Sequence, residues 1–227
     1  MNQVGYAVCH QMPSRSLHYG GRSLPVCARD TGMFLAFAVV FIALIALYGR
    51  RPLRTPSRPK VAVLCALVLP LLVDAVTSYA GLRESNNAVR LITGALAGTA
   101  GAALLFPLFS SVVLNPGEHL SGTDAHERRA LGTWPSLAVL LIAPIVVCLA
   151  MWPDWPGAYW LMAPFLTLAI LLALAALNLT LVALILDHVV GAAHIPAWAP
   201  GAIAGVAALA ELALANGLHR LADHIAR

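Results

Sequence analysis

Two cysteines, a histidine and an aspartate gather near the start of the chain, in the stretch VCHQMPSRSLHYGGRSLPVCARDTG (residues 8–32). Cys9 and His10 are adjacent, and Asp30 follows Cys27 by three residues. Thiolate, imidazole and carboxylate groups are the ligands of tetrahedral zinc, so these four residues predict a zinc site. Two alternatives stay open: Cys9 and Cys27 form a disulfide, or both thiols simply pack. The first two possibilities require the sulfur atoms to lie within about 7 Å of each other.

A second set of polar residues begins with Asp74, which lies inside the apolar run LVLPLLVDAVTSYA. An isolated carboxylate at that depth in a membrane is costly to keep ionised. Arg83, Asn87 and Arg90 follow at helical spacing, and an antiparallel hairpin of helices would let Asp74 meet Arg83 or Arg90. One hypothesis is an ion pair that locks two helices. The other is an anion site, in which the guanidinium groups grip a phosphate and Asp74 acts as base or nucleophile.

Three further arginines, Arg15, Arg22 and Arg29, stand among glycines and prolines in the first stretch. Such residues beside a membrane often contact lipid phosphates. The glycines and prolines favour a folded loop, which we expect to cover the ends of the second and third helices and add guanidinium groups to the Asp74 region. The expected pocket then holds five arginines and three acids: Arg15, Arg22, Arg29, Arg83 and Arg90, against Asp30, Asp74 and Glu84. An anion such as a lipid phosphate would balance the surplus of positive charge.

The composition places these residues in a membrane protein. Hydrophobic residues make up 60% of the 227 positions and charged residues 11%, whereas soluble domains carry roughly 25% charged residues. The mean hydropathy of +0.81 also indicates a membrane protein. The chain is basic, with a pI near 9.1, but its basic residues are scattered through short loops. This arrangement does not favour nucleic acid as a partner, and we expect membrane lipids instead.

Six apolar runs are long enough to be considered as membrane-spanning helices, which need about 20 residues each. They are residues 32–48, 61–82, 89–114, 134–152, 158–186 and 197–218. The expected fold is therefore all-α, a polytopic transmembrane bundle of about six helices. Residues 1–31 form an extramembrane loop that covers one face, residues 32–218 the bundle, and residues 219–227 a short amphipathic tail at the surface.

Small and polar residues inside the runs predict how the helices pack. Gly94, Gly98 and Gly101 form a stripe that lets a partner backbone approach closely. Asn178 and Glu211 lie within the fifth and sixth runs, where such groups usually hydrogen-bond another helix. Either residue is also a candidate to line a cavity or a proton path.

The loop at residues 49–60 indicates the orientation of the bundle. It contains five basic residues and no acid: Arg50, Arg51, Arg54, Arg58 and Lys60. By the positive-inside rule this loop is cytoplasmic. In an inner membrane, the N-terminal stretch, the 82–89 loop and the C-terminus would then lie outside.

The two motif regions resemble a family of predicted bacterial and archaeal membrane proteins of unknown function. The shared pattern is Cys-His-x-x-Pro-x-Arg-Ser, a glycine and Pro-x-Cys-Ala-Arg-x-Thr-Gly, followed by a second block from Asp74 to Gly98. The resemblance covers about the first 110 residues, and many relatives carry a cysteine at the position of Asp30. A weaker likeness is to membrane proteins of the teicoplanin-resistance type, which implies action on lipid head groups or lipid-linked phosphates.

Three functions follow from these patterns. The first is an enzyme that acts on a lipid-linked phosphate or head group, with Asp74, Arg83, Asn87 and Arg90 as its site. The second is a metal-binding or redox membrane protein that uses the cysteines and His10. The third is a transporter with Asp74 and Glu211 as the ionisable residues inside the membrane that line its transport path.

Overall fold

The computed structural model describes residues 3–9, 11–49, 51, 53–116, 130–151, 157–190 and 198–225. The described part is mostly helical, with one small hairpin near the N-terminus. In chain order the elements are α1 Gln3–Val8, η1 Pro13–Arg15, β1 Ser16–Tyr19, β2 Arg22–Cys27, α2 Ala28–Tyr48, α3 Arg58–Ala66, α4 Leu69–Tyr79, α5 Asn87–Phe109, η2 Ser110–Leu114, α7 Trp134–Ala150, α8 Ala158–Val190 and α9 Ala199–Ile225.

The long apolar helices confirm the predicted all-α transmembrane bundle. Within the described ranges, five helical segments are long and apolar enough to cross a membrane: α2, α3 with α4, α5 with η2, α8 and α9. The sixth expected span, α7, is an apolar helix of 17 residues. At 1.5 Å per residue it extends about 26 Å, slightly less than the roughly 30 Å of a bilayer core. The chain is therefore a multi-pass membrane protein.

Helices α2 and α5 form the centre of the bundle and pack backbone against backbone. A Cβ atom added at Gly94 would collide with the carbonyl oxygen of Arg29, and one added at Gly98 with that of Met33. Gly32 on α2 meets the carbonyl oxygen of Leu91 in the same way. The predicted close approach of a partner backbone is thus confirmed at Gly94 and Gly98, and the partner is α2; at Gly101 the nearest atom is Phe37 Cδ2, at 3.9 Å.

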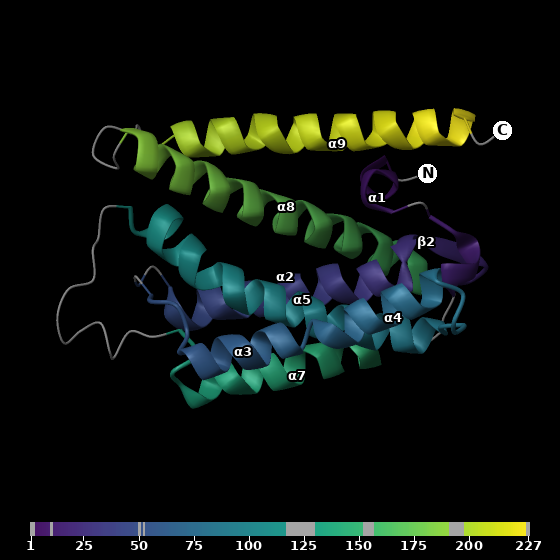
Figure 1. Cartoon of the computed structure of the whole chain (residues 1–227), viewed down its shortest axis with the longest axis horizontal. Helices are drawn as coiled ribbons and strands as arrows, with labels where there is room; N and C mark the ends of the chain where they lie inside the picture. The colour runs from purple at the N-terminus through teal and green to yellow at the C-terminus, as the bar shows by residue number, and fades with distance from the viewer. Residues whose placement is uncertain are drawn as a thin grey trace.

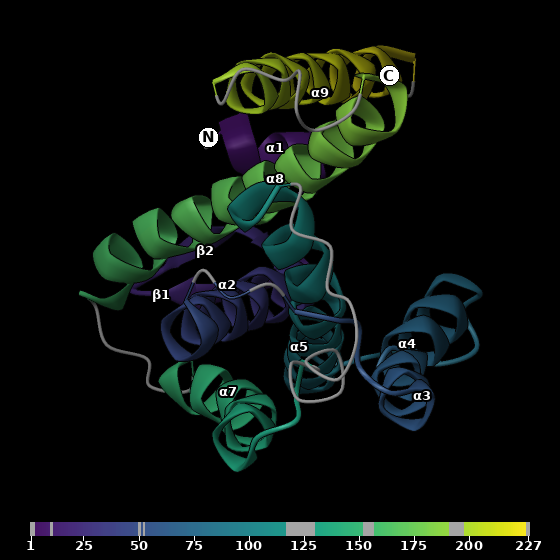
Figure 2. The same cartoon turned by 90° about the vertical axis from the view of Figure 1, so that its left-hand side faces the viewer.

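The other helices surround this pair. Figure 2 shows α3 and α4 against α5 on one side, α7 on another, and α8 and α9 on a third. Helix α9 contacts α8 and α1. The amide of Asn178 in α8 donates to Glu211 Oε2 in α9 at 3.0 Å, which confirms the expected contact between helices.

One end of the bundle carries the basic loop, and we call it the basic end. Here Lys60 Nζ donates to the carbonyl oxygen of Leu131 at 2.7 Å, and Ala130 N donates to that of Arg54 at 3.0 Å. The loop that follows α2 is thereby tied to the segment that precedes α7. Arg50, also expected at this end, lies outside the described residues.

The opposite end carries the N-terminal motifs, and we call it the motif end. The hydroxyl of Tyr19 in β1 donates to the carbonyl oxygen of Met151, just after α7, at 2.6 Å. His219 of α9 donates from Nδ1 to the carbonyl oxygen of Tyr6 in α1 at 2.7 Å. In Figure 1 the N-terminal elements, the end of α4 and the C-terminus accordingly gather on the right.

Three predicted boundaries need correction. Helix α2 begins at Ala28, so Arg29 and Asp30 belong to its first turn and not to the loop at residues 1–31. The second span consists of two helices, because Pro70 has no backbone N–H with which to continue α3. Residues 219–225 continue α9 and do not form a separate tail.

Candidate functional site

A β-hairpin positions the first motif stretch. Strands β1 and β2 pair antiparallel, with Tyr19 opposite Arg22. The turn between them consists of Gly20 and Gly21, both with positive φ (55° and 77°), the conformation that two-residue hairpin turns require and glycine supplies. Asn87 Nδ2 donates to the carbonyl oxygen of Ser16 at 3.1 Å, which fastens the hairpin to the start of α5. The Gly-Gly pair was the sequence signal for this turn.

Asp74 connects three segments at the motif end. Its carboxylate forms ion pairs with Arg29 of α2 and with Arg83, the latter at 2.5 Å. The hydroxyl of Ser85 donates to Oδ1 at 2.6 Å, and Asp74 is only 2% exposed. The predicted Arg83 partner is confirmed. The sequence placed Arg29 in the Asp74 region without naming it as the direct partner, and it did not predict the contact with Ser85.

Arg90, the other predicted partner of Asp74, does not pair with it. Asn86 caps α5 by accepting from Val89 N at 2.9 Å, so Asn87 and Arg90 lie on its first turn. There Arg90 Nη1 donates to Asn87 Oδ1 at 3.2 Å. Arg90 is 7% exposed, and among the described residues it forms no ion pair, because those found all belong to Asp74.

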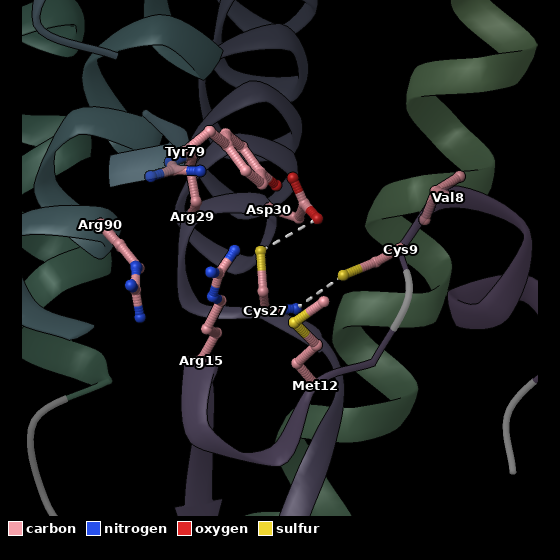
Figure 3. A pocket seen from close by; sticks show the side chains of 9 residues that line it. All are labelled: Val8, Cys9, Met12, Arg15, Cys27, Arg29, Asp30, Tyr79 and Arg90. Atoms are coloured by element: carbon pink, nitrogen blue, oxygen red, sulfur yellow. Dashed lines mark hydrogen bonds between the residues drawn. The ribbon is translucent and has the colours of Figure 1, made fainter. Parts of the chain in front are cut away.

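A cavity of about 430 Å³ opens between the hairpin, α2, α4 and α5. Figure 3 shows the side chains that line it, with two thiols and a carboxylate grouped together and the guanidinium groups of Arg15 and Arg90 to one side. The lining residues are Val8, Cys9, Met12, Arg15, Cys27, Arg29, Asp30, Tyr79 and Arg90. Residues of both motif regions therefore meet in one pocket.

The expected set of pocket residues is only partly assembled. Arg22 points elsewhere and stacks on the rings of Tyr159 and Trp160, at 5.6 Å and 4.9 Å from their centroids. Asp74 lies behind Arg29 and is not part of the lining. Arg15 stacks on Tyr79 at 5.2 Å, a contact that the sequence did not predict.

The cavity wall carries more positive than negative charge. Arg15, Arg29 and Arg90 face one acid, Asp30, which leaves a surplus of two positive charges when the thiols are neutral. Arg15 and Arg29 repel the charge of Arg90, and Asp74 attracts it. Arg29 Nε is buried and has no hydrogen-bond partner in the described part of the chain. The wall therefore offers positive charge to an anion.

Cys9, Cys27 and Asp30 form a compact cluster on the same wall. One ligand atom from each lies within 4.8 Å of the other two, which confirms the prediction that the two sulfur atoms are close. Cys27 Sγ donates to Asp30 Oδ2 at 3.1 Å, and Cys27 N donates to Cys9 Sγ at 3.3 Å. Both cysteines are free thiols. His10, the fourth predicted ligand, lies outside the described residues.

The environment of Cys27 favours its neutral form. A hydrogen bond with the Cys9 thiol, burial, and the negative charge of Asp30 all raise the pKa of the Cys27 thiol. Without a cation beside it, this thiol is therefore protonated at neutral pH. A metal ion would have to displace the proton in order to bind.

Comparisons with known proteins give one family model and two relatives, each of which matches less than half of the chain. The model of the family "Predicted membrane protein (DUF2085)" matches residues 9–104. An uncharacterised protein of Methanothermobacter thermautotrophicus is 32% identical over 108 residues, which are 48% of this chain and 92% of that protein. The chain belongs to the DUF2085 family. Its Cys, Asp and Arg residues in the cavity wall all fall within the matched segment.

A second relative is an uncharacterised protein of Methanocaldococcus jannaschii, 34% identical over 106 residues. That match spans 47% of this chain and 66% of the relative, slightly less than two thirds of its length. No solved structure matches the chain. The DUF2085 segment thus ends within α5, and helices α7 to α9 lie beyond it.

Proposed function

We propose that the pocket at the motif end binds the phosphate group of a membrane lipid or lipid-linked intermediate. The observation that carries this proposal is Arg90, a buried guanidinium that forms no ion pair within the described residues. A buried charge without an ion-pair partner is costly, and a bound phosphate would supply a negative charge beside it.

The chemistry of the wall suits a phosphate. Guanidinium groups bind phosphate oxygens in pairs, and Arg15, Arg29 and Arg90 approach the cavity from three different elements. A phosphomonoester carries about −1.5 to −2 charges at neutral pH, close to the surplus of two positive charges on the wall. The lining also includes residues at the ends of the apolar helices α2, α4 and α5, and lipid head groups lie at the ends of membrane-spanning helices.

Asp74 has the contacts of a positioning residue. Arg29, Arg83 and Ser85 occupy its carboxylate, and it does not reach the cavity. We infer that it holds Arg29 in place and does not itself attack or deprotonate a substrate. If the protein is an enzyme, the wall residues left for that role are Asp30 and the two thiols.

The pocket is proposed to face the outside of the inner membrane. The positive-inside rule places the basic end in the cytoplasm, and the motif end is the opposite end of the same helices. A ligand would then be a lipid of the outer leaflet or a lipid-linked intermediate presented there.

Replacement of Arg90 tests the phosphate proposal. The protein is purified in detergent, and binding of phosphatidic acid and of inorganic phosphate is titrated for the wild type, Arg90→Gln and Arg22→Gln. We expect Arg90→Gln to weaken phosphatidic acid binding at least tenfold, because a charge-assisted bond inside a desolvated site is lost. Arg22→Gln is the matched control, since Arg22 lies against Tyr159 and Trp160 outside the cavity.

The two ligands separate the possible sources of the phosphate. Binding of phosphatidic acid that depends on Arg90 and exceeds that of inorganic phosphate supports a lipid ligand. Equal affinity for both would indicate a free phosphate. If Arg90→Gln and Arg22→Gln behave alike, the pocket does not bind phosphate through Arg90.

A further inference from the structure

We propose that Cys9, Cys27 and Asp30 bind one zinc ion in the wall of this pocket. Cys9 is distant in the sequence from Cys27 and Asp30, but each of the three residues contributes one ligand atom, and these atoms lie within 4.8 Å of one another. The proposal does not depend on phosphate binding, since it rests on the ligand geometry alone.

The spacing of the ligand atoms is close to that of a zinc site. With Zn–S distances of about 2.3 Å and Zn–O distances of about 2.0 Å, tetrahedral ligand atoms lie about 3.3–3.8 Å apart. Cys27 Sγ and Asp30 Oδ2 are already 3.1 Å apart, and the widest separation in the cluster is at most 4.8 Å. Side-chain rotations that move the atoms by about 1 Å or less would complete the site.

The local structure holds the ligands in place. Cys27 is the residue that precedes α2, and Asp30 lies on its first turn, so both face the positive end of the helix dipole. Cys9 follows α1, which packs so tightly on β2 that a Cβ atom at Gly5 would collide with the carbonyl oxygen of Pro25. The backbone N–H of Cys27 points at Cys9 Sγ and would stabilise a thiolate there.

The donor set selects the metal. Thiolate ligands favour zinc over magnesium and calcium, which prefer oxygen. Among the described residues three protein ligands are present, and all three line the cavity, so the fourth tetrahedral position of this set faces the pocket. This is the arrangement of zinc sites that bind water or a substrate oxygen.

The bound metal would leave the pocket positive. With zinc bound, two thiolates, one carboxylate and the dication sum to one negative charge. Arg15, Arg29 and Arg90 carry three positive charges on the same wall. A surplus of positive charge therefore remains available to an anion.

Metal analysis of the purified protein tests the proposal. The protein is prepared under reducing conditions without chelator, and its zinc content is measured by mass spectrometry. Cobalt(II) is then titrated into the metal-free protein while the thiolate-to-cobalt absorption is recorded. We expect one zinc ion per chain and a charge-transfer band that indicates thiolate ligands.

Matched variants assign the ligands. Cys27→Ser and Asp30→Asn should each lower metal affinity by more than the roughly 10–100-fold that loss of an outer partner costs. Cys65→Ser is the control, because Cys65 is an exposed residue of α3 outside the cluster. It should leave both the stoichiometry and the cobalt spectrum unchanged.

The cobalt spectrum of the wild type keeps the test independent of how well the variants fold. A protein that binds no zinc, or whose cobalt spectrum lacks a thiolate band, overturns the proposal. A Cys9–Cys27 disulfide that persists under reducing conditions also overturns it. Phosphatidic acid binding, measured on the same samples, separates failure of the metal site from failure of the phosphate site.

Discussion

At the scale of single residues, Asp74 is paired with two arginines that differ in burial. The side chain of Arg29 is 12% exposed and that of Arg83 is 47% exposed. Loss of a partner from a buried ion pair costs about 3–5 kcal/mol, whereas an exposed pair contributes about 1 kcal/mol or less. We therefore expect Arg29→Gln to destabilise the protein by about 3 kcal/mol and Arg83→Gln by less than about 1 kcal/mol. Chemical unfolding in detergent micelles measures both, and equal losses would contradict the assignment of Arg29 as the principal partner.

At the scale of elements, the contact between α2 and α5 positions Arg29 and decides the shape of the pocket. Gly98 and Gly101 lie on the same helix but differ in the space around them. A Cβ atom added at Gly98 would collide with the carbonyl oxygen of Met33. A Cβ atom added at Gly101 would meet only Phe37 Cδ2, at 3.9 Å. We expect Gly98→Ala to cost about 1–3 kcal/mol, because the helices must separate. Gly101→Ala should be neutral or slightly stabilising, since alanine is the better helix former. Thermal unfolding of the two purified variants compares them directly. A similar melting temperature for both would show that the helices do not pack as closely as described.

At the scale of the whole molecule, the two ends of the bundle should face opposite sides of the membrane. Single cysteines are introduced at Ser57, in the basic loop, and at Glu84, between α4 and α5. A membrane-impermeant maleimide applied to intact cells should label the Glu84→Cys chain and leave the Ser57→Cys chain at the level of the unmodified protein. Disruption of the cells should expose Ser57→Cys to the reagent. Labelling of Ser57→Cys before disruption would reverse the topology and place the pocket in the cytoplasm.

The sequence by itself determined the class of fold and most of the residues in the pocket. Apolar runs fix membrane helices because backbone groups in lipid must be satisfied within the helix, so the spans follow from local composition. Residue type likewise marked Cys9, Cys27 and Asp30 as candidate metal ligands, because thiolates and a carboxylate in one short stretch can bind zinc, with a disulfide or packed thiols as the alternatives.

Only the tertiary structure decided which charges meet. The sequence placed Arg22 in the pocket and paired Asp74 with Arg83 or Arg90, whereas the fold turns Arg22 toward Tyr159 and brings Arg29 to Asp74. Helix α2 begins early enough to carry Arg29 on its first turn, and Gly94 lets that turn approach α5. Such contacts join residues 45 or more positions apart, so they depend on how helices pack and not on spacing along the chain. Arg90 is left as a buried charge facing a cavity for the same reason.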